Sequence, residues 1–339
     1  MLPVVTGVPQ GSILGPLFDT LFTNELPEVI HSHVENKFQV KCNLCGSLCC
    51  YADDSSFSFS SRNIEIIEEQ LSIKYQDISN FMCNNRLKLN GDKTHLMLLA
   101  SDRSWRTKLT EDSLGLFTEP NTPKINSARK ENILGCLVSQ NLKWTEHLLL
   151  NEKSLVKKLT CRLNALKLIG SVANFKTRLM FANGLFMSKL AYAMPVWGGC
   201  EDFLIRSLQV VQNKAARLVC RKGIYTPIET LLTECNWLSV AQLVVFHSTV
   251  LLYKVQKSQR PSYLFNMFTS ERRYATRGEN HGKLQSSSMN PPTQKLNCLS
   301  FRWRSLQTWN QLPANIRQID NIDEFKIKLK TWIREHVEI

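Results

Sequence analysis

The spacing of apolar residues changes near Thr145, and this change constrains the fold more than any other feature. Before it, short runs between turn residues, among them residues 95–101, predict strands, and helices are predicted from residue 12 to about residue 31 and over residues 64–82. After it, apolar residues recur every three or four positions, which is typical of amphipathic helices. The helices predicted there cover residues 147–169, 174–194, 201–221 and 239–258, and the stretch NIDEFKIKLKTWIREHV is amphipathic, with Phe325, Leu329, Trp332 and Ile333 on one side. A small antiparallel sheet with helices on one face, followed by a mostly helical region, gives an α+β fold.

Composition favours a globular protein. The chain has 339 residues, of which 43% are hydrophobic, so it can bury more than one core. No apolar run approaches the roughly 18 to 20 residues that span a bilayer, so no membrane partner is expected. The first residues, MLPVVTGVPQGS, lack the basic start and apolar stretch of a signal peptide. We expect an intracellular protein, and without a targeting signal both nucleus and cytoplasm stay open.

Four of the eleven cysteines cluster in the stretch CNLCGSLCC, at Cys42, Cys45, Cys49 and Cys50. A zinc site usually needs two separated pairs of ligands, whereas the second pair here is contiguous and no histidine follows at ligand spacing. Residues 38–44 alternate between apolar and polar side chains, as a strand does. The pattern favours free thiols in a protein core over metal ligands or a disulfide framework.

Charge is distributed unevenly along the chain. Residues 1–60 carry two lysines against six carboxylates, whereas residues 143–222 carry 14 basic residues against four acidic ones. Residues 254–339 carry 15 basic residues against seven acidic ones. This distribution suits a polyanion bound along the basic part of the chain. A generally basic, solvated surface is the alternative, and charge by itself does not distinguish the two.

The stretch LCCYADDSSFSF places Asp53 and Asp54 side by side, with no basic neighbour in sequence to offset their charge. The flanking residues 48–51 and 55–59 are predicted strands, so the pair lies in a tight hairpin turn. A carboxylate pair on such a turn suits Mg²⁺, which takes carboxylate and phosphate oxygens as ligands. A solvated turn is the alternative, because Asp is also a favoured turn residue.

Four ordered segments resemble motifs of a known enzyme family. They are GVPQGSILGPLF, YADD, NNRLKLNGDKTHLMLLAS and ILGCLVSQNLKWTEHL. In that order they resemble the palm and the start of the thumb of reverse transcriptases, most closely those of non-LTR (LINE-like) retrotransposons. The C-terminal stretch from SFRWRSLQTWNQLP onward is similar to the tail that follows the thumb in many such elements. The resemblance covers nearly the whole chain.

The resemblance implies an RNA-directed DNA polymerase with a two-metal site that uses Mg²⁺ or Mn²⁺. Asp53 matches the metal-binding aspartate of the YADD motif, and Asp54 matches its less directly coordinating neighbour. Tyr51 and Ala52 match the residues that place this turn beneath the primer end. The implied partners are an RNA template and a DNA primer, paired as an RNA–DNA hybrid, and deoxynucleoside triphosphates. No obligate protein partner is indicated.

Two further segments receive roles from the resemblance. Pro9, Gln10 and Gly11 match the turn that contacts the templating pair and the incoming nucleotide. Glycine suits that turn, because a backbone that approaches a substrate closely leaves no room for a side chain. Lys93, in LNGDKT, matches the lysine proposed to protonate the departing pyrophosphate, and an ordinary surface lysine is the alternative.

The basic residues after Thr145 are predicted to contact nucleic-acid backbone. Leucines at 155, 159, 163 and 166 step by four, four and three, so they form a buried stripe. Basic side chains beside that stripe then face outward, where they can neutralise phosphates of a hybrid. The predicted contact residues are Lys153, Lys157, Lys158, Arg162, Lys176 and Arg178.

The resemblance divides the chain into three regions. Residues 1–146 match a partial palm, in which the stretch ILGCLVSQNLKW is a predicted hairpin that matches the primer grip. Residues 147–222 match a helical thumb, and residues 223–339 form a mostly helical C-terminal region with a flexible linker near 280–294. A polymerase palm needs a further metal-binding aspartate before the Pro-Gln-Gly turn, and residues 1–18 contain no acidic residue. We therefore expect an N-terminally truncated polymerase that is inactive by itself. A non-catalytic remnant that binds nucleic acid or a partner is the alternative.

Overall fold

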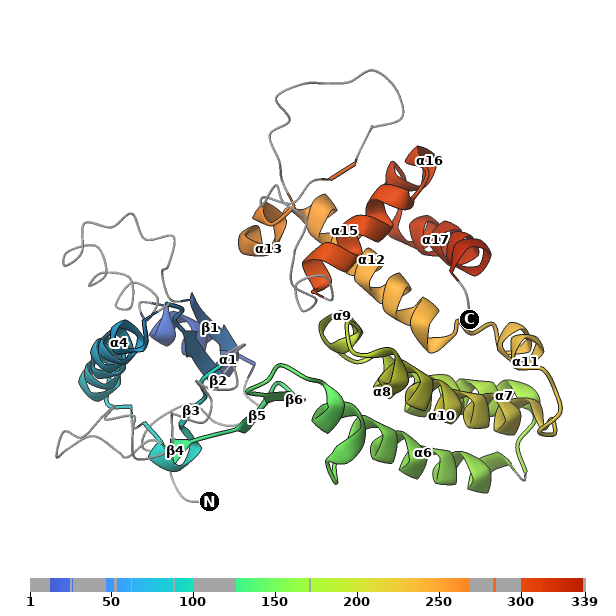
Figure 1. The fold of residues 1–339 in the computed structure, drawn as a ribbon, viewed down its shortest axis with the longest axis horizontal. Coiled ribbons are helices and arrows are strands. Elements are labelled where there is room, and N and C mark those ends of the chain that lie inside the picture. Colours follow the sequence, from blue (N-terminus) through green and yellow to red (C-terminus); the bar gives the residue numbers. More distant parts are fainter. Residues whose placement is uncertain are drawn as a thin grey trace. The chain divides into compact units, whose positions relative to one another are not determined.

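The computed structural model describes residues 13–24, 26, 47–51, 54–61, 63–87, 89–99, 126–170, 172–268, 283–284 and 300–337. The chain divides into two compact units, Met1–Glu131 and Asn132–Ile339. Figure 1 shows the strands labelled β1–β4 and helix α4 in the first unit and a series of helices in the second. Each unit is described by itself.

The first unit is built around a hairpin and one long helix. Strands β1 (Ser47–Tyr51) and β2 (Asp54–Ser58) pair antiparallel, and α4 spans Ile64–Asn84. Asn63 caps α4, because its side chain accepts a hydrogen bond from the backbone N–H of Glu65. The hairpin and the helix are both confirmed as predicted, with the hairpin bounds shifted by one residue.

A small core joins this hairpin to the helix. Leu26 and Phe81 are buried, and Phe57 of β2 packs against them together with Ile78 and Met82 of α4. Ile78 lies three positions before Phe81 and four before Met82, which puts these side chains on one side of the helix. Burial of Phe57 therefore fixes which face of the hairpin is turned toward α4.

Other elements of this unit differ from the prediction. Helix α1 covers Gly15–Thr23, shorter than the predicted helix from residue 12 to about residue 31. The predicted strand over residues 95–101 is only β3 (His95–Leu96), which pairs parallel with β4 (Asn126–Ser127). The described strands form three two-stranded sheets, which with the helices are consistent with the predicted α+β class, although the described residues do not form one continuous sheet.

A second hairpin begins at the last two residues of the first unit and continues into the second. Strands β5 (Lys130–Ile133) and β6 (Cys136–Ser139) are joined by Leu134 and Gly135, at φ +47° and +79°. Two consecutive residues with positive φ match the type I′ turn, whose twist suits a two-residue hairpin. The hairpin predicted from ILGCLVSQNLKW is confirmed.

Helices form the rest of this unit. After the π-helical turn η2 (Glu146–Leu150) they are α6 (Leu155–Gly170), α7 (Phe175–Phe181), the π-helical segment η3 (Ala182–Met187), α8 (Ser188–Ala191), α9 (Met194–Trp197), α10 (Asp202–Cys220), α11 (Ile228–Glu234), α12 (Val240–Ser258), α13 (Ser262–Asn266), α15 (Phe301–Gln311), α16 (Ala314–Arg317) and α17 (Ile322–His336). Helices α10 and α12 match the prediction to within one residue at each end, whereas the predicted helix 174–194 is divided into several pieces. None of the described helices is long and apolar enough to cross a bilayer.

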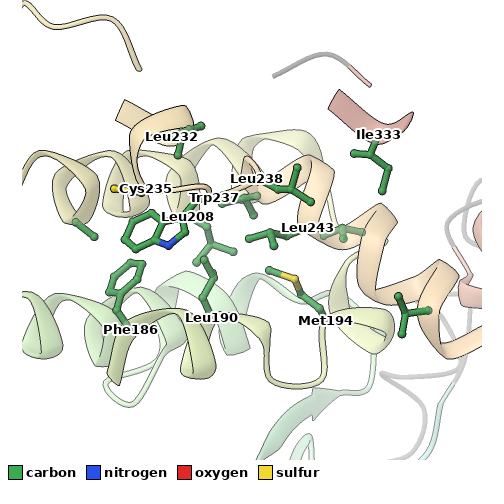
Figure 2. Packing of buried hydrophobic residues seen from close by; sticks show 14 of the residues in the cluster. Phe186, Leu190, Met194, Leu208, Leu232, Cys235, Trp237, Leu238, Leu243 and Ile333 are labelled. Carbon is green, nitrogen blue, oxygen red and sulfur yellow. The ribbon is translucent and has the colours of Figure 1, made fainter. Parts of the chain in front are cut away.

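One hydrophobic cluster runs through the second unit from Leu148 to Ile333. Figure 2 shows Trp237 in this cluster together with Phe186 and Leu208. The predicted leucine stripe of α6 is confirmed, since its four members are each at most 4% exposed. Because the cluster crosses residue 222, the predicted thumb and C-terminal region share one core. Their separate roles stay a prediction.

Two further expectations meet the structure only in part. Cys49 and Cys50 are exposed on β1, so the prediction of core thiols is wrong for this pair, whereas Cys42 and Cys45 lie outside the described residues. Within the predicted linker, Leu284 exchanges two hydrogen bonds with the Asn310 side chain, at 2.9 and 2.8 Å. This part of the predicted linker is therefore held against the helical unit.

Candidate active site and nucleic-acid interface

The β1–β2 hairpin presents Asp54 to solvent at the end of its ladder. Tyr51 pairs directly with Asp54, so a two-residue connection links the strands, as the YADD motif predicts. Alternate residues of a strand point to opposite faces, so Asp54 lies on the face opposite to Phe57. Since Phe57 packs toward α4, both Asp54 and Tyr51 are exposed, Tyr51 at 67%. Packing on one face thus leaves the carboxylate free on the other.

Serine side chains add hydrogen bonds across this hairpin. The Ser56 hydroxyl donates to the carbonyl oxygen of Cys49 at 3.3 Å, and the Ser55 hydroxyl donates to Cys50 Sγ at 3.5 Å. The connection itself, Ala52 and Asp53, lies outside the described residues, as do Pro9, Gln10 and Gly11. The hairpin therefore supplies one described carboxylate, Asp54, beside the position of Asp53. A carboxylate on a fixed turn fits the oxygen ligands that Mg²⁺ prefers.

Lys93 lies on a short 3₁₀ turn, Gly91–Lys93, that precedes β3. The Asn90 side chain accepts from the backbone N–H of Asp92 at 3.1 Å, and the Thr94 hydroxyl donates to the Asn90 carbonyl at 2.8 Å. These bonds fix the backbone of the turn, while the Lys93 side chain is exposed. Its proposed proton-donor role stays a prediction.

Residues 153–200 form a stretch of one charge sign. They contain eight lysines and arginines and no aspartate or glutamate, the eight being Lys153, Lys157, Lys158, Arg162, Lys167, Lys176, Arg178 and Lys189. Lys157 on α6 and Lys176 on α7 are exposed, as predicted. Lys153 is exposed too, although it lies in the turn before α6 and not on the helix, where its backbone N–H donates to Asn151 Oδ1 at 2.8 Å.

Two arginines of the predicted contact set point into the protein. Arg178 is only 7% exposed, and its guanidinium donates to the carbonyls of Val219 at 2.7 Å and Ala173 at 2.6 Å. It thus satisfies a carbonyl in the last turn of α10, which an arginine at a helix C-terminus commonly does. The Arg162 guanidinium donates to the carbonyl of Leu185. The expectation that all six side chains face outward is wrong for Arg178, and Arg162 is half-buried.

His147 was not predicted as a functional residue, yet it joins hairpin and helices. The backbone N–H of Leu137 donates to its Nδ1 at 3.1 Å, which leaves the proton of the neutral ring on Nε2. The ring is 8% exposed and makes an edge contact with Trp144 at 5.9 Å between centroids. Burial, and then the charges of Lys158 and Lys189, lower the pKa of His147 to about 4.

This pKa predicts an acid-sensitive contribution to stability. The pKa of His147 is about 4 in the folded chain and about 6.5 in the unfolded chain, so the unfolded chain binds more protons between these values. The contribution is fully present above pH 6.5 and is lost as the pH falls toward 4. We expect His147→Gln to remove about 2 kcal/mol of the loss in unfolding free energy between pH 7.5 and 4.5. Urea titrations of both proteins measure it, and parallel pH profiles would contradict it.

The comparisons with known proteins agree with the motifs. Residues 2–143 match the family described as reverse transcriptase (RNA-dependent DNA polymerase). This segment is therefore similar to the reverse transcriptase family. The match includes both the YADD hairpin and the Lys93 turn.

Two transposon proteins of Drosophila melanogaster are similar to a longer part of the chain. The probable RNA-directed DNA polymerase from transposon X-element is 24% identical over 305 residues, which are 87% of this chain and 28% of that protein. The probable RNA-directed DNA polymerase from transposon BS is 24% identical over 248 residues, 72% of this chain and 25% of that protein. The chain thus spans about a quarter of the length of these relatives, and their similarity supports the resemblance to non-LTR retrotransposon enzymes. No solved structure matches the chain.

Proposed function

We propose that the chain is the part of an RNA-directed DNA polymerase that holds the catalytic turn and grips the RNA–DNA hybrid. One observation carries this proposal. Within the segment that matches the reverse transcriptase family, the hairpin packs one face on α4 and turns Asp54 toward solvent at a two-residue connection. An exposed carboxylate there is suited to bind a metal ion that also takes phosphate oxygens of a substrate as ligands.

The chemistry proposed for this turn is nucleotidyl transfer with two metal ions. Asp53 and Asp54 would hold Mg²⁺ or Mn²⁺, which activates the primer 3′-hydroxyl and stabilises the leaving pyrophosphate when bound. Tyr51 and Ala52 would place the turn beneath the primer end. Lys93 would donate a proton to the departing pyrophosphate.

The turn that contacts the templating pair completes the proposed site. Pro9, Gln10 and Gly11 would contact this pair and the incoming deoxynucleoside triphosphate, with the RNA as template and the DNA as primer. All three lie within the segment that matches the reverse transcriptase family. Their role stays part of the proposal.

These 339 residues are not expected to extend a primer without further protein. Two carboxylates on one turn do not enclose two ions, so a third carboxylate from elsewhere is needed. Within the part of the chain that the structure describes, no group of three or more His, Cys, Asp or Glu could hold a metal. The test is a fusion to the preceding segment of a related full-length polymerase, assayed for primer extension on RNA. An inactive fusion that still binds hybrid would favour the non-catalytic binding protein instead.

The basic stretch is proposed to bind the hybrid through its phosphates. Lys153, in the turn before α6, and Lys157, on α6, are exposed and four residues apart, and α6 contains no acidic residue. When a protein binds through phosphates, the logarithm of the binding constant falls linearly with the logarithm of the salt concentration. The slope is about 0.7 to 0.9 per neutralised phosphate. Lys153→Gln combined with Lys157→Gln should therefore lower this slope by up to about 2 and weaken binding at low salt. Fluorescence anisotropy with a labelled hybrid between 50 and 300 mM NaCl measures both quantities.

A matched control removes the same charge elsewhere. Lys254 on α12 and Lys328 on α17 are exposed lysines of the same unit, and both lie outside residues 153–200. Changing both to Gln should alter the salt slope by less than about half as much as the Lys153 and Lys157 double variant does, because α12 and α17 are not part of the proposed nucleic-acid interface. Equal changes from both double variants would show that only net charge matters and would contradict a localised interface.

A further inference from the structure

A small pocket lies where the β5–β6 hairpin meets η2, α6 and α8. It is lined by Gly135, His147, Leu155, Lys158, Lys189 and Tyr192. The Tyr192 hydroxyl donates to the carbonyl of Leu134 at 2.6 Å, which ties the end of α8 to the hairpin turn. A Cβ added to Gly135 would lie 3.6 Å from the Tyr192 ring, so the turn and the ring are in close contact. The pocket is therefore held by bonded elements and not by a loose loop.

Two lysines of this pocket have no carboxylate partner among the described residues. Burial, and then the charges of Lys189, Lys153 and Arg162, lower the pKa of Lys158, against a smaller opposing effect of Cys136. The Lys189 ammonium lies 5.1 Å from the centroid of the Tyr192 ring. Two ammonium groups around one pocket repel each other in the free protein. An anion between them would remove that repulsion.

His147 adds a third donor on the wall of the same pocket. Because its Nδ1 accepts from Leu137, the neutral ring carries its proton on Nε2, and no described residue accepts from that nitrogen. The cavity volume is about 10 Å³, close to that of a single water-sized probe. This volume admits one oxygen atom of a ligand and excludes a nucleobase or a sugar.

We propose that this pocket receives one oxygen atom of a phosphate group in a nucleic-acid strand, with Lys158, Lys189 and His147 as its donors. A backbone phosphate carries one negative charge and can accept hydrogen bonds from two ammonium groups and a neutral imidazole N–H. Hydrogen bonds to charged acceptors are the strong ones. The exposed Lys153 and Lys157 continue the positive charge from this point along α6, as an extended polyanion requires. The inference rests on the proposed function, and it assigns His147, Lys189 and the Gly135 turn to phosphate binding for the first time.

If the two lysines bind phosphate, replacing either should weaken hybrid binding without lowering the stability of the fold. If their role were only structural, replacing them should lower stability. Lys158→Met or Lys189→Met removes a repulsion in the free protein, so neither should lower the unfolding midpoint in urea. Each should weaken the binding of a labelled 16-base-pair RNA–DNA hybrid by about tenfold at 100 mM NaCl. Lys167→Met, an exposed lysine of the same helix outside the pocket, should weaken binding by about twofold only. Fluorescence anisotropy and urea titrations on the full chain measure both effects.

Inorganic phosphate gives a second readout that does not depend on nucleic acid. In the wild-type chain, 20 mM phosphate should shift the imidazole ¹⁵N resonances of His147, whereas equal ionic strength from NaCl should not. The shift should be lost in the Lys158→Met and Lys189→Met variants and kept in Lys167→Met. Equal losses of hybrid affinity in pocket and control variants, or a His147 resonance that phosphate leaves unmoved, would overturn the proposal. Neither readout uses primer extension, so an inactive fusion would refute the polymerase proposal alone.

Discussion

Trp197→Ala should destabilise the helical unit by about 3 to 5 kcal/mol, because it opens a large cavity in a close-packed core. Trp197 is the largest fully buried side chain among the described residues, and its Nε1 donates to the carbonyl of Tyr192 at 2.9 Å. The next residue shows how tight this site is, since a Cβ on Gly198 would lie 2.5 Å from Val244 Cγ1 of α12. Little relaxation of α9 toward α12 is therefore available to fill the cavity. Urea unfolding followed by circular dichroism measures the change.

An aromatic residue at the surface of the same unit provides the comparison. Phe203 of α10 is 49% exposed, so Phe203→Ala removes little buried area and should cost less than about 1 kcal/mol. If Trp197→Ala lowered the unfolding free energy no more than Phe203→Ala does, the packing described here around α9 would be wrong. Loss of the folded circular dichroism signal at zero urea would be the extreme form of the expected result.

Much of the helical fold was predictable, because one face of each long helix is buried. The period of three and four fixes α10, α12 and α17, and Phe325, Leu329 and Trp332 of α17 are buried as the pattern indicates. The divided helix after Asn174 was not predictable from periodicity. There Ala193 takes φ +53° and Pro195 lies in the first turn of α9, so the chain changes direction although its apolar residues continue. Pro lacks the N–H that a continuing helix would need.

The candidate sites differ in how local their signals are. The YADD turn was predictable, because turn residues between two alternating strands act over a few positions. The phosphate pocket was not, since Tyr192 meets Leu134 across 58 positions of sequence. The only sequence signal for this pocket was the absence of Asp and Glu from residues 153–200. The helical period gave no indication that Arg178 donates a hydrogen bond to the carbonyl of Val219, because capping of a neighbouring helix depends on tertiary contacts.

Asp53→Asn should lower primer extension by roughly a thousandfold or more in a fusion that adds the preceding segment of a related full-length polymerase. Asparagine keeps the size of the side chain but loses the charge that holds a divalent ion. Asp54→Asn should cost less, because Asp54 pairs with Tyr51 in the ladder and matches the less directly coordinating neighbour. Glu69→Gln, an exposed carboxylate on α4, is the matched control and should stay within about twofold of the parent.

The most direct test of the central claim is single-nucleotide extension of a DNA primer on an RNA template with Mg²⁺, by the fusion and by its Asp53→Asn variant. We expect extension by the fusion, none above background by the Asp53→Asn variant, and none by the unfused 339 residues. Equal extension by the fusion and its Asp53→Asn variant would contradict the assignment of the catalytic turn. Extension by the unfused chain that Asp53→Asn abolishes would contradict the need for a third carboxylate.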